Sequence, residues 1–436
     1  MPSARIVPAT VGSLGDLFPF LAAGQELHRR GHRVTVATHS IHQIPVEQAG
    51  LVFADASGMA VPEDRQVFTA QAFHRWRGPR FVVHDIAALD VRASYAKLLP
   101  ICADADVLVT STLAFAAQIL AEQGSASGRL RWLSVALAPA GFISASDPPA
   151  TGVTWIDSFL HQSPRRGRWL AKVATHITYP WTAPIRAFRR EPGLPGQSPL
   201  GDPFHRGQHA PQGVLAMFSP LLGTPQPDWP PHAVVTGSTR YAQPFAADPD
   251  LNDFLDAGPA PLVFTLGSAA VHAGVHFLRE SAKAAHQLDQ RAVLLTGSPE
   301  MRARLPRDLP ATIHCVDYAA HADLFPRAAI IIHHGGIGTS SEAAARGKRR
   351  CWWCRMGSTS QTTPHGCGGW ASLKACPPAA IRQIELRCCC GVCCVIHATR
   401  MRPNWPGQPC VKNTAQSSLP TASRRHCGNS VATAKE

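Results

Sequence analysis

The first 40 residues alternate between two hydrophobic periods, and this alternation limits the possible folds more than any other feature of the chain. ARIVPATVG has the apolar character of a buried strand, FPFLAAGQELHRRG carries apolar residues at helical spacing and stops at Gly31, and RVTVATH is again strand-like. Two strands joined through a helix lie parallel in one sheet. The sequence therefore predicts an α/β fold that begins with a βαβ unit.

Similar segments follow further along the chain. ADVLVTST and RWLSVALAP continue the first series, and a second series opens with GVLAMFS and HAVVTG and resumes with PLVFTLGS, RAVLLTGS, TIHCVDY and AIIIHHGG. Pro, Gly and His dominate between Pro199 and Gly213, as is typical of a linker. We therefore predict two doubly wound, Rossmann-like domains that face a crevice, at residues 1–205 and 213–348.

Basic and aromatic residues interleave between His161 and Glu191, in segments that we interpret as helices. They form either a solvated face or the rim of a binding pocket. The residues alone leave both interpretations open.

The composition changes abruptly after Lys348. Of the 13 cysteines only Cys102 and Cys315 precede it. Of the 42 Lys and Arg residues 30 lie in residues 1–348 and 12 in residues 349–436, and the 29 acidic residues divide into 27 and 2. The strong positive charge is therefore a property of residues 349–436, which we call the tail. Two cysteines in the remainder indicate a reducing compartment. With no recognisable signal peptide or membrane span, we expect a cytoplasmic protein.

Two loops at predicted strand ends carry chemical signals. GSLGDLFP places Asp16 near the start of a helix, either as a functional carboxylate or as a helix cap. HHGGIGTSSEAAARG joins a strand to a helix through glycines, and such a helix start presents free amides to an anion. Here Thr339 and Glu342 have the spacing of a capping box, which competes with a binding role for Glu342. FTLGS is a weaker signal of the same kind.

Together these motifs resemble the family 1 glycosyltransferases of the GT-B fold, over Arg5 to Lys348. The similarity rests on GSLGDLFPFLAAGQELHRRGHRVTVAT, LVFTLGS and VDYAAHADLFPRAAIIIHHGGIGTSSEAAARGK. QPDWP and FLDAGPAPLVFTLGS are similar to bacterial rhamnosyltransferases and to sterol and macrolide glycosyltransferases. The resemblance implies a UDP-glycosyltransferase, specifically a hexosyltransferase, that inverts the sugar's configuration.

The resemblance also implies the roles of individual residues. Asp16 takes the place of the general base, within a loop formed by Gly12, Ser13 and Gly15. The nucleotide-sugar site is implied to consist of Gly267, Ser268, Tyr318, His321, His334, Gly336, Gly338, Thr339 and Glu342.

Within that site the resemblance assigns each part of the donor to particular residues. The positions that hold the diphosphate are Ser268, His334, Gly338 and Thr339. Tyr318 stacks on the nucleobase beside His321, and Glu342 binds the ribose hydroxyls. The donor is a UDP- or dTDP-sugar and the acceptor a lipophilic hydroxyl compound, without cofactor, metal or nucleic acid. Peripheral contact with a membrane through the first domain is compatible with such an acceptor.

After Lys348 the chain departs from the family, which continues with a strand and an Asp-Gln pair that binds the sugar. Regrouping the codons of CWWC by one base gives Leu-Val-Val, because every Trp codon ends in G, and the next codons permit Asp-Gln. We therefore predict that the tail is an out-of-frame, disordered segment and that the second domain is incomplete. Two alternatives are a metal module built on Cys351-x-x-Cys354 and Cys388–Cys394, and a basic nucleic-acid arm. An active transferase and a defective remnant that at most binds nucleotide both remain open.

Overall fold

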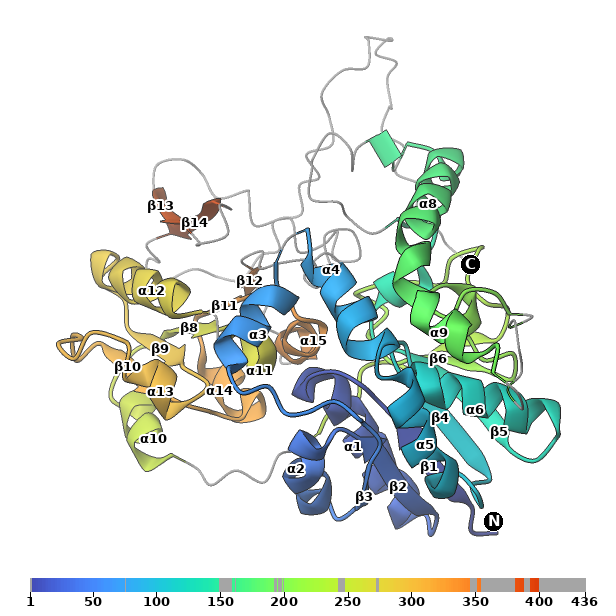
Figure 1. Ribbon diagram of the computed structural model, residues 1–436. Helices are drawn as coiled ribbons and strands as arrows, with labels where there is room; N and C mark the ends of the chain where they lie inside the picture. Colours follow the sequence, from blue (N-terminus) through green and yellow to red (C-terminus); the bar gives the residue numbers. More distant parts are fainter. Residues whose placement is uncertain are drawn as a thin grey trace, which may run out of the picture.

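The computed structural model contains two parallel β-sheets with helices packed around them (Figure 1). It describes residues 2–74, 76–148, 159–160, 162–191, 194, 198, 200–241, 248–271, 274–345, 351–353, 381–387 and 393–399. The predicted α/β class with two parallel sheets is confirmed.

The first sheet has seven parallel strands in the order β3-β2-β1-β4-β5-β6-β7. The strands are β1 (Arg5–Ala9), β2 (Arg33–Thr38), β3 (Val52–Asp55), β4 (Val107–Ser111), β5 (Arg131–Ala136), β6 (Val214–Ala216) and β7 (Ala233–Val235). β1 pairs in parallel with β2, and the helix Leu14–Arg29 joins them, which confirms that the chain opens with a βαβ unit.

The strands β6 and β7 lie in the first sheet, although we expected GVLAMFS and HAVVTG to open the second series. β6 pairs with β5, where Ser134 lies opposite Val214, and the Ser134 amide donates to the Gly213 carbonyl at 3.1 Å. The change of sheet therefore falls between Val235 and Leu262 and not between Pro199 and Gly213. A long helical insertion separates β5 from β6, and the stretch just before β6 has the composition of a linker. We therefore did not expect this pairing.

The first half contains the helices α1 (Leu14–Arg29), α2 (Gln43–Gln48), α3 (Arg65–Ala72), α4 (Gly78–Arg80), α5 (Val91–Ile101), α6 (Phe115–Ala126), α8 (Pro164–Thr178) and α9 (Ala183–Phe188). Of these, α1, α2 and α6 lie against strands of the first sheet. The largest core cluster includes Leu108, Phe115, Ile119 and Trp132, each at most 1% exposed. Burial of such a side chain contributes about 1.5–3 kcal/mol. The segment between His161 and Glu191 is helical as predicted.

The second sheet has the order β10-β9-β8-β11-β12, again with parallel pairing throughout. Its strands are β8 (Leu262–Thr265), β9 (Ala292–Leu295), β10 (Ile313–Val316), β11 (Ile330–His333) and β12 (Cys351–Trp353). The helices of this half are α10 (Pro249–Asp256), α11 (Gly267–Ala270), α12 (Val275–Gln287), α13 (Pro299–Arg302), α14 (His321–Arg327) and α15 (Ile337–Ala345).

Both faces of the second sheet are buried. Along β8, Phe264 belongs to one apolar cluster and Val263 to another on the opposite face. A strand covered on both sides reads as a continuous hydrophobic run, which explains why PLVFTLGS shows no alternation of polar and apolar residues.

Three described segments of the tail are strands. β12 joins the second sheet, with Ile331 opposite Cys351 and His333 opposite Trp353. β13 (Ile381–Arg387) and β14 (Cys393–Thr399) form an antiparallel pair. The expectation of a tail without regular structure is therefore wrong for these segments. Cys354 and residues 388–392 lie outside the described residues. No helix in the described part of the chain has the length and apolarity to cross a bilayer.

Candidate functional site

The turn from β1 into α1 holds the Asp16 carboxylate in place. Its Oδ2 accepts hydrogen bonds from the Ser13 amide at 2.8 Å and from the Ser13 hydroxyl at 3.0 Å. Gly12 has φ +143°, and a Cβ at this position would lie 2.3 Å from the same oxygen. The predicted capping contact is therefore present, and the carboxylate that makes it sits against a position that only glycine fits.

Burial raises the pKa of Asp16 above its ordinary value of 3.8, and the two hydrogen bonds from Ser13 oppose this effect. A carboxylate with a raised pKa is a stronger proton acceptor than an exposed one. The turn thus presents a basic carboxylate at the start of α1.

His42 supports this turn from the neighbouring strand connection. Its Nε2 lies 3.0 Å from the Gly12 carbonyl oxygen, and the residue is 4% exposed. Burial lowers the pKa of His42, so the neutral ring donates its N–H to that carbonyl. No motif in the sequence distinguishes His42 from the other 20 histidines.

In the second half, His334 lies between two glycines from different strand ends. A Cβ on Gly267, after β8, would lie 2.7 Å from the His334 ring, and a Cβ on Gly336, after β11, would lie 2.4 Å from it. Gly267 also has φ +67°. The structure thus brings together Gly267, His334 and Gly336 of the predicted site, and both glycines make room for the imidazole.

Three histidines lie close enough here to influence each other. Burial, followed by the influence of His321, lowers the pKa of His334 to about 4, and burial also lowers that of His321 to about 4. The pKa of His333 falls to about 3, first through burial and then through His334 and His321. The Gly335 amide donates to His333 Nδ1 at 3.2 Å. These rings are therefore neutral at physiological pH.

The helix α15 begins at Ile337, so Thr339 lies inside its first turn. This position argues against the alternative of a capping box between Thr339 and Glu342, because a capping box requires Thr339 to precede the helix. Thr339 is 7% exposed, and the Ser340 hydroxyl donates to the Gly336 carbonyl at 2.9 Å. Gly338 and Ser268 are exposed.

Tyr318, after β10, and Glu342, on α15 after β11, lie beyond the carboxyl edge of the second sheet, where the charge of Glu342 acts on Tyr318. Tyr318 is 37% exposed, and its pKa is raised first by burial and then by Glu342 and Tyr241. The Tyr241 ring, from the segment after β7, packs on Phe18 of α1 with ring centroids 5.2 Å apart. Tyr241 was missed because it lies outside every motif, and Phe18 was given no role although it lies within GSLGDLFP.

Contacts between the halves bring the two groups of predicted residues to one junction. α1, which carries Asp16, lies against α11, which contains Gly267 and Ser268. The Ser238 and Ser341 hydroxyls are 3.0 Å apart, and Ile337 packs against the aromatic cluster of the first half. The predicted base and the predicted phosphate site therefore occur on helices that meet.

Comparisons with known proteins fit this architecture. Residues 6–135 match the glycosyltransferase family 28 N-terminal domain, which spans β1 to β5. The O-mycaminosyltylonolide 6-deoxyallosyltransferase of Streptomyces fradiae is 30% identical over 366 residues, covering 79% of this chain and 78% of that enzyme. A sterol 3-beta-glucosyltransferase of Arabidopsis thaliana is 24% identical, covering 80% of this chain and 56% of its own length.

Among solved structures, the glycotransferase of kitacinnamycin superposes with a TM-score of 0.56 at 18% identity, and the match covers 85% of both chains. This similarity shows the fold, and the 30% identity to the Streptomyces enzyme over most of both sequences decides the family. The chain belongs to the glycosyltransferases of the GT-B fold.

Proposed function

We propose that this chain transfers a hexose from a UDP- or dTDP-sugar to a hydroxyl group of a lipophilic small molecule, with inversion at the anomeric carbon. The observation that supports the proposal is the contact between α1 and α11, since the Asp16 turn begins α1 and Gly267 of α11 lies against His334. The names of the relatives support the acceptor class, since they specify a 6-deoxyallosyl transfer to O-mycaminosyltylonolide and a glucosyl transfer to a sterol.

Asp16 acts as the general base in this proposal. The acceptor oxygen attacks the anomeric carbon while its proton passes to the Asp16 carboxylate, and the bond from that carbon to the diphosphate oxygen breaks. The raised pKa of Asp16 strengthens it as a proton acceptor. Ser13 orients the carboxylate through Oδ2. A single displacement of this kind inverts the anomeric configuration.

The departing diphosphate is stabilised by the start of α15 and by His334. The first amides of a helix have no partner within the helix and favour an anion. His334 Nδ1 is buried and without a hydrogen-bond partner in the described part of the chain, so it is available to the ligand. Its low pKa makes it a neutral donor. Ser268, Gly338 and Thr339 complete the proposed diphosphate site.

The nucleoside is held at the same edge of the second sheet. Tyr318 provides a partly exposed ring for stacking on the nucleobase beside His321, and Glu342 binds the ribose hydroxyls. The neighbouring positions of Tyr318 and Glu342 support this assignment, since a base and its ribose are adjacent groups of one ligand.

Calorimetric titration with UDP and dTDP tests the nucleotide site. His334→Ala should weaken binding at least tenfold, because it removes a buried hydrogen-bond donor to an anion, which is worth about 1.5–3 kcal/mol. His286→Ala, at an exposed position of α12, is the matched control and should bind like the wild type. Equal affinity of the wild type and His334→Ala would contradict the phosphate role.

We further propose that the chain after Lys348 is read from another frame, which makes this product a remnant with impaired transfer. Two forced valines and a forced leucine at CWWC support this. The family's Asp-Gln pair is then missing from the protein.

Sequencing the gene across the codons for Gly347 to Arg355, in independent isolates, tests this proposal. A single-base insertion or deletion relative to sister genes is the expected result. An uninterrupted frame shared by all isolates, together with stoichiometric zinc in the purified chain, would instead support a metal module.

A further inference from the structure

The helix α8 stands at the outer edge of the first half and is unusually basic on its outer side. Four of its residues, Arg165, Arg168, Lys172 and His176, are exposed, and Trp169 is 62% exposed among them. At about 100° per residue these five side chains fall within an arc of about 100°. We call them the α8 stripe.

No acidic residue balances the stripe along the chain. Asp and Glu are absent between Asp157 and Glu191, although the chain up to Lys348 is nearly neutral, with 30 basic and 27 acidic residues. Among the described residues none of Arg165, Arg168 and Lys172 forms an ion pair. The positive charge of the stripe is therefore available to a partner.

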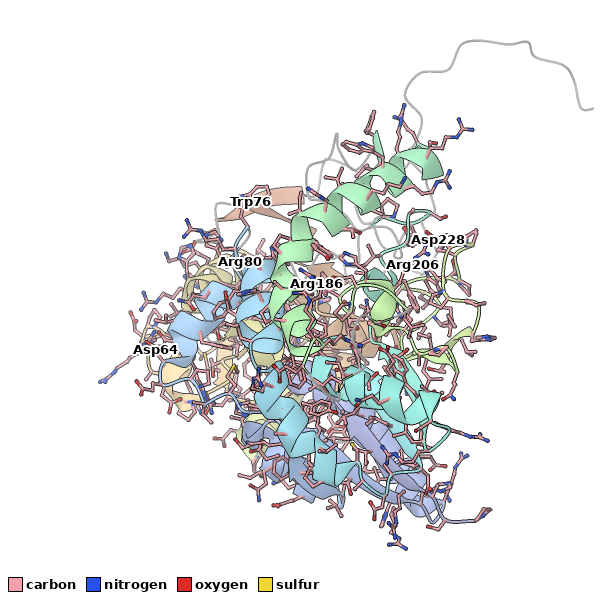
Figure 2. All side chains as sticks on the ribbon, turned by 45° about the vertical axis from the view of Figure 1, so that its right-hand side comes forward. Asp64, Trp76, Arg80, Arg186, Arg206 and Asp228 are labelled. Carbon is pink, nitrogen blue, oxygen red and sulfur yellow. The ribbon has the colours of Figure 1, made fainter. Side chains whose placement is uncertain are left out.

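Large apolar side chains are exposed near both ends of the same helix. Ile177, in its last turn, is 58% exposed, and the flanking Tyr179 and Phe159 are 48% and 45% exposed. The Arg166 guanidinium lies 4.1 Å above the Phe159 ring, and that of Arg186 lies 3.6 Å above the Tyr179 ring. Figure 2 shows α8 rising from the body of the molecule with its side chains projecting outward. Exposed aromatic and basic groups thus share one protruding element.

We propose that the α8 stripe docks the protein on an anionic lipid bilayer. Lys and Arg are attracted to anionic headgroups, and Trp and Tyr favour the boundary between headgroups and acyl chains. A nucleic-acid duplex would be bound mainly through its phosphates and would leave Trp169, Ile177 and Phe159 unexplained. The docking proposal does not depend on the proposed sugar transfer, although a lipophilic acceptor would be concentrated at the same surface.

Vesicle sedimentation of the full chain tests the docking. Vesicles of phosphatidylcholine mixed with phosphatidylglycerol should bind the protein, and vesicles of phosphatidylcholine alone should bind it far less. The triple variant Arg165→Gln, Arg168→Gln, Lys172→Gln should lower partitioning to anionic vesicles about hundredfold, since each basic group contributes about fivefold. Added salt should likewise lower the partitioning of the wild type to anionic vesicles.

The basic tail requires a matched control. The triple variant Arg400→Gln, Arg402→Gln, Lys412→Gln removes the same charge and should retain most of the binding. Equal losses in the two triple variants would assign the attraction to total charge and overturn the proposal.

A second readout follows Trp169 itself. Brominated acyl chains in anionic vesicles should quench part of the protein's fluorescence, and Trp169→Phe should remove that quenched part. Quenching that is unchanged in Trp169→Phe would show that α8 does not reach the bilayer. A different result would assign the stripe to nucleic acid: duplex DNA displaces the wild type from vesicles, and the first triple variant no longer binds that DNA.

Discussion

At the scale of single residues, the Asp16 turn contains two glycines, and replacing them by alanine should have opposite effects on stability. Gly12→Ala should lower stability by about 1–3 kcal/mol, because φ is +143° and the new Cβ would collide with the carboxylate. Gly15→Ala is the matched control, since its Cβ would meet only the Ser13 hydroxyl at 3.5 Å within α1. It should raise stability by about 0.4–1 kcal/mol. Thermal midpoints measure both, and a similar change in both variants would contradict the turn geometry.

Buried histidines predict how stability depends on pH. The pKa values of His209, His321 and His334 lie at about 4, against 6.5 for an exposed histidine. Between these values the unfolded chain binds protons that the folded chain does not, so stability falls as the pH decreases from 6.5 towards 4. The raised pKa of Asp16 acts in the opposite direction, but for one group only.

Thermal midpoints at pH 7 and pH 5 measure this loss, which should be on the order of 1 kcal/mol per buried histidine per pH unit below 6.5. His209→Gln should reduce the difference between the two midpoints, because its ring, stacked on Phe142, is one of the groups that resist protonation. A midpoint that is unchanged or higher at pH 5 would contradict the assignment of neutral buried rings.

The sequence identified residues at strand ends but not the residues that hold them in place. Gly12, Asp16, Gly267 and His334 follow recognisable strands, and parallel strands bring such ends together. The supporting groups His42 and Tyr241 act through contacts with distant segments. The local sequence does not indicate such contacts, so these two residues could be identified only from the structure.

At the scale of elements, the QPDWP motif anchors the loop after β5. Asp228, labelled in Figure 2, accepts hydrogen bonds from the Ser144 hydroxyl at 2.6 Å and from the Ala145 amide at 2.5 Å. The adjacent Trp229 stacks on Phe142 with ring centroids 4.0 Å apart. The motif thus connects the loop after β5 to the segment after β6.

Asp228→Ala should lower stability by about 1–3 kcal/mol, because it leaves the Ser144 hydroxyl and the Ala145 amide without their charged acceptor. It should also speed proteolytic cleavage between residues 143 and 147. Asp308→Ala, at an exposed loop position of the second half, is the control and should have little effect on either measurement. Unchanged cleavage in Asp228→Ala would show that the loop is held by other contacts.

The strands of the second sheet were predictable because their hydrophobic runs are continuous and end in glycine turns. The sheet to which β6 and β7 belong could not be predicted, since the pattern of a strand indicates that it is buried but not which strand it pairs with. β6 is three residues long and pairs with β5 only after a long helical insertion. Pairing at such separation depends on the packing of the insertion, which periodicity does not report.

At the scale of the whole molecule, the two sheets meet through α1, α11 and the segment that contains Ser238 and Tyr241. Each half contributes one part of the proposed chemistry, a base from the first and an anion site from the second. The account therefore requires that nucleotide binding and proton transfer be separable by mutation.

The most direct measurement is transfer by a chain whose reading frame is restored after Lys348, with and without Asp16→Asn, using UDP- and dTDP-hexoses and a sterol as acceptor. The account predicts a glycoside of inverted configuration from the restored chain that keeps Asp16. It predicts turnover at least tenfold lower in Asp16→Asn, since general bases contribute about 10²–10⁴ in rate, with nucleotide affinity nearly unchanged. Full turnover by Asp16→Asn would contradict the assigned mechanism.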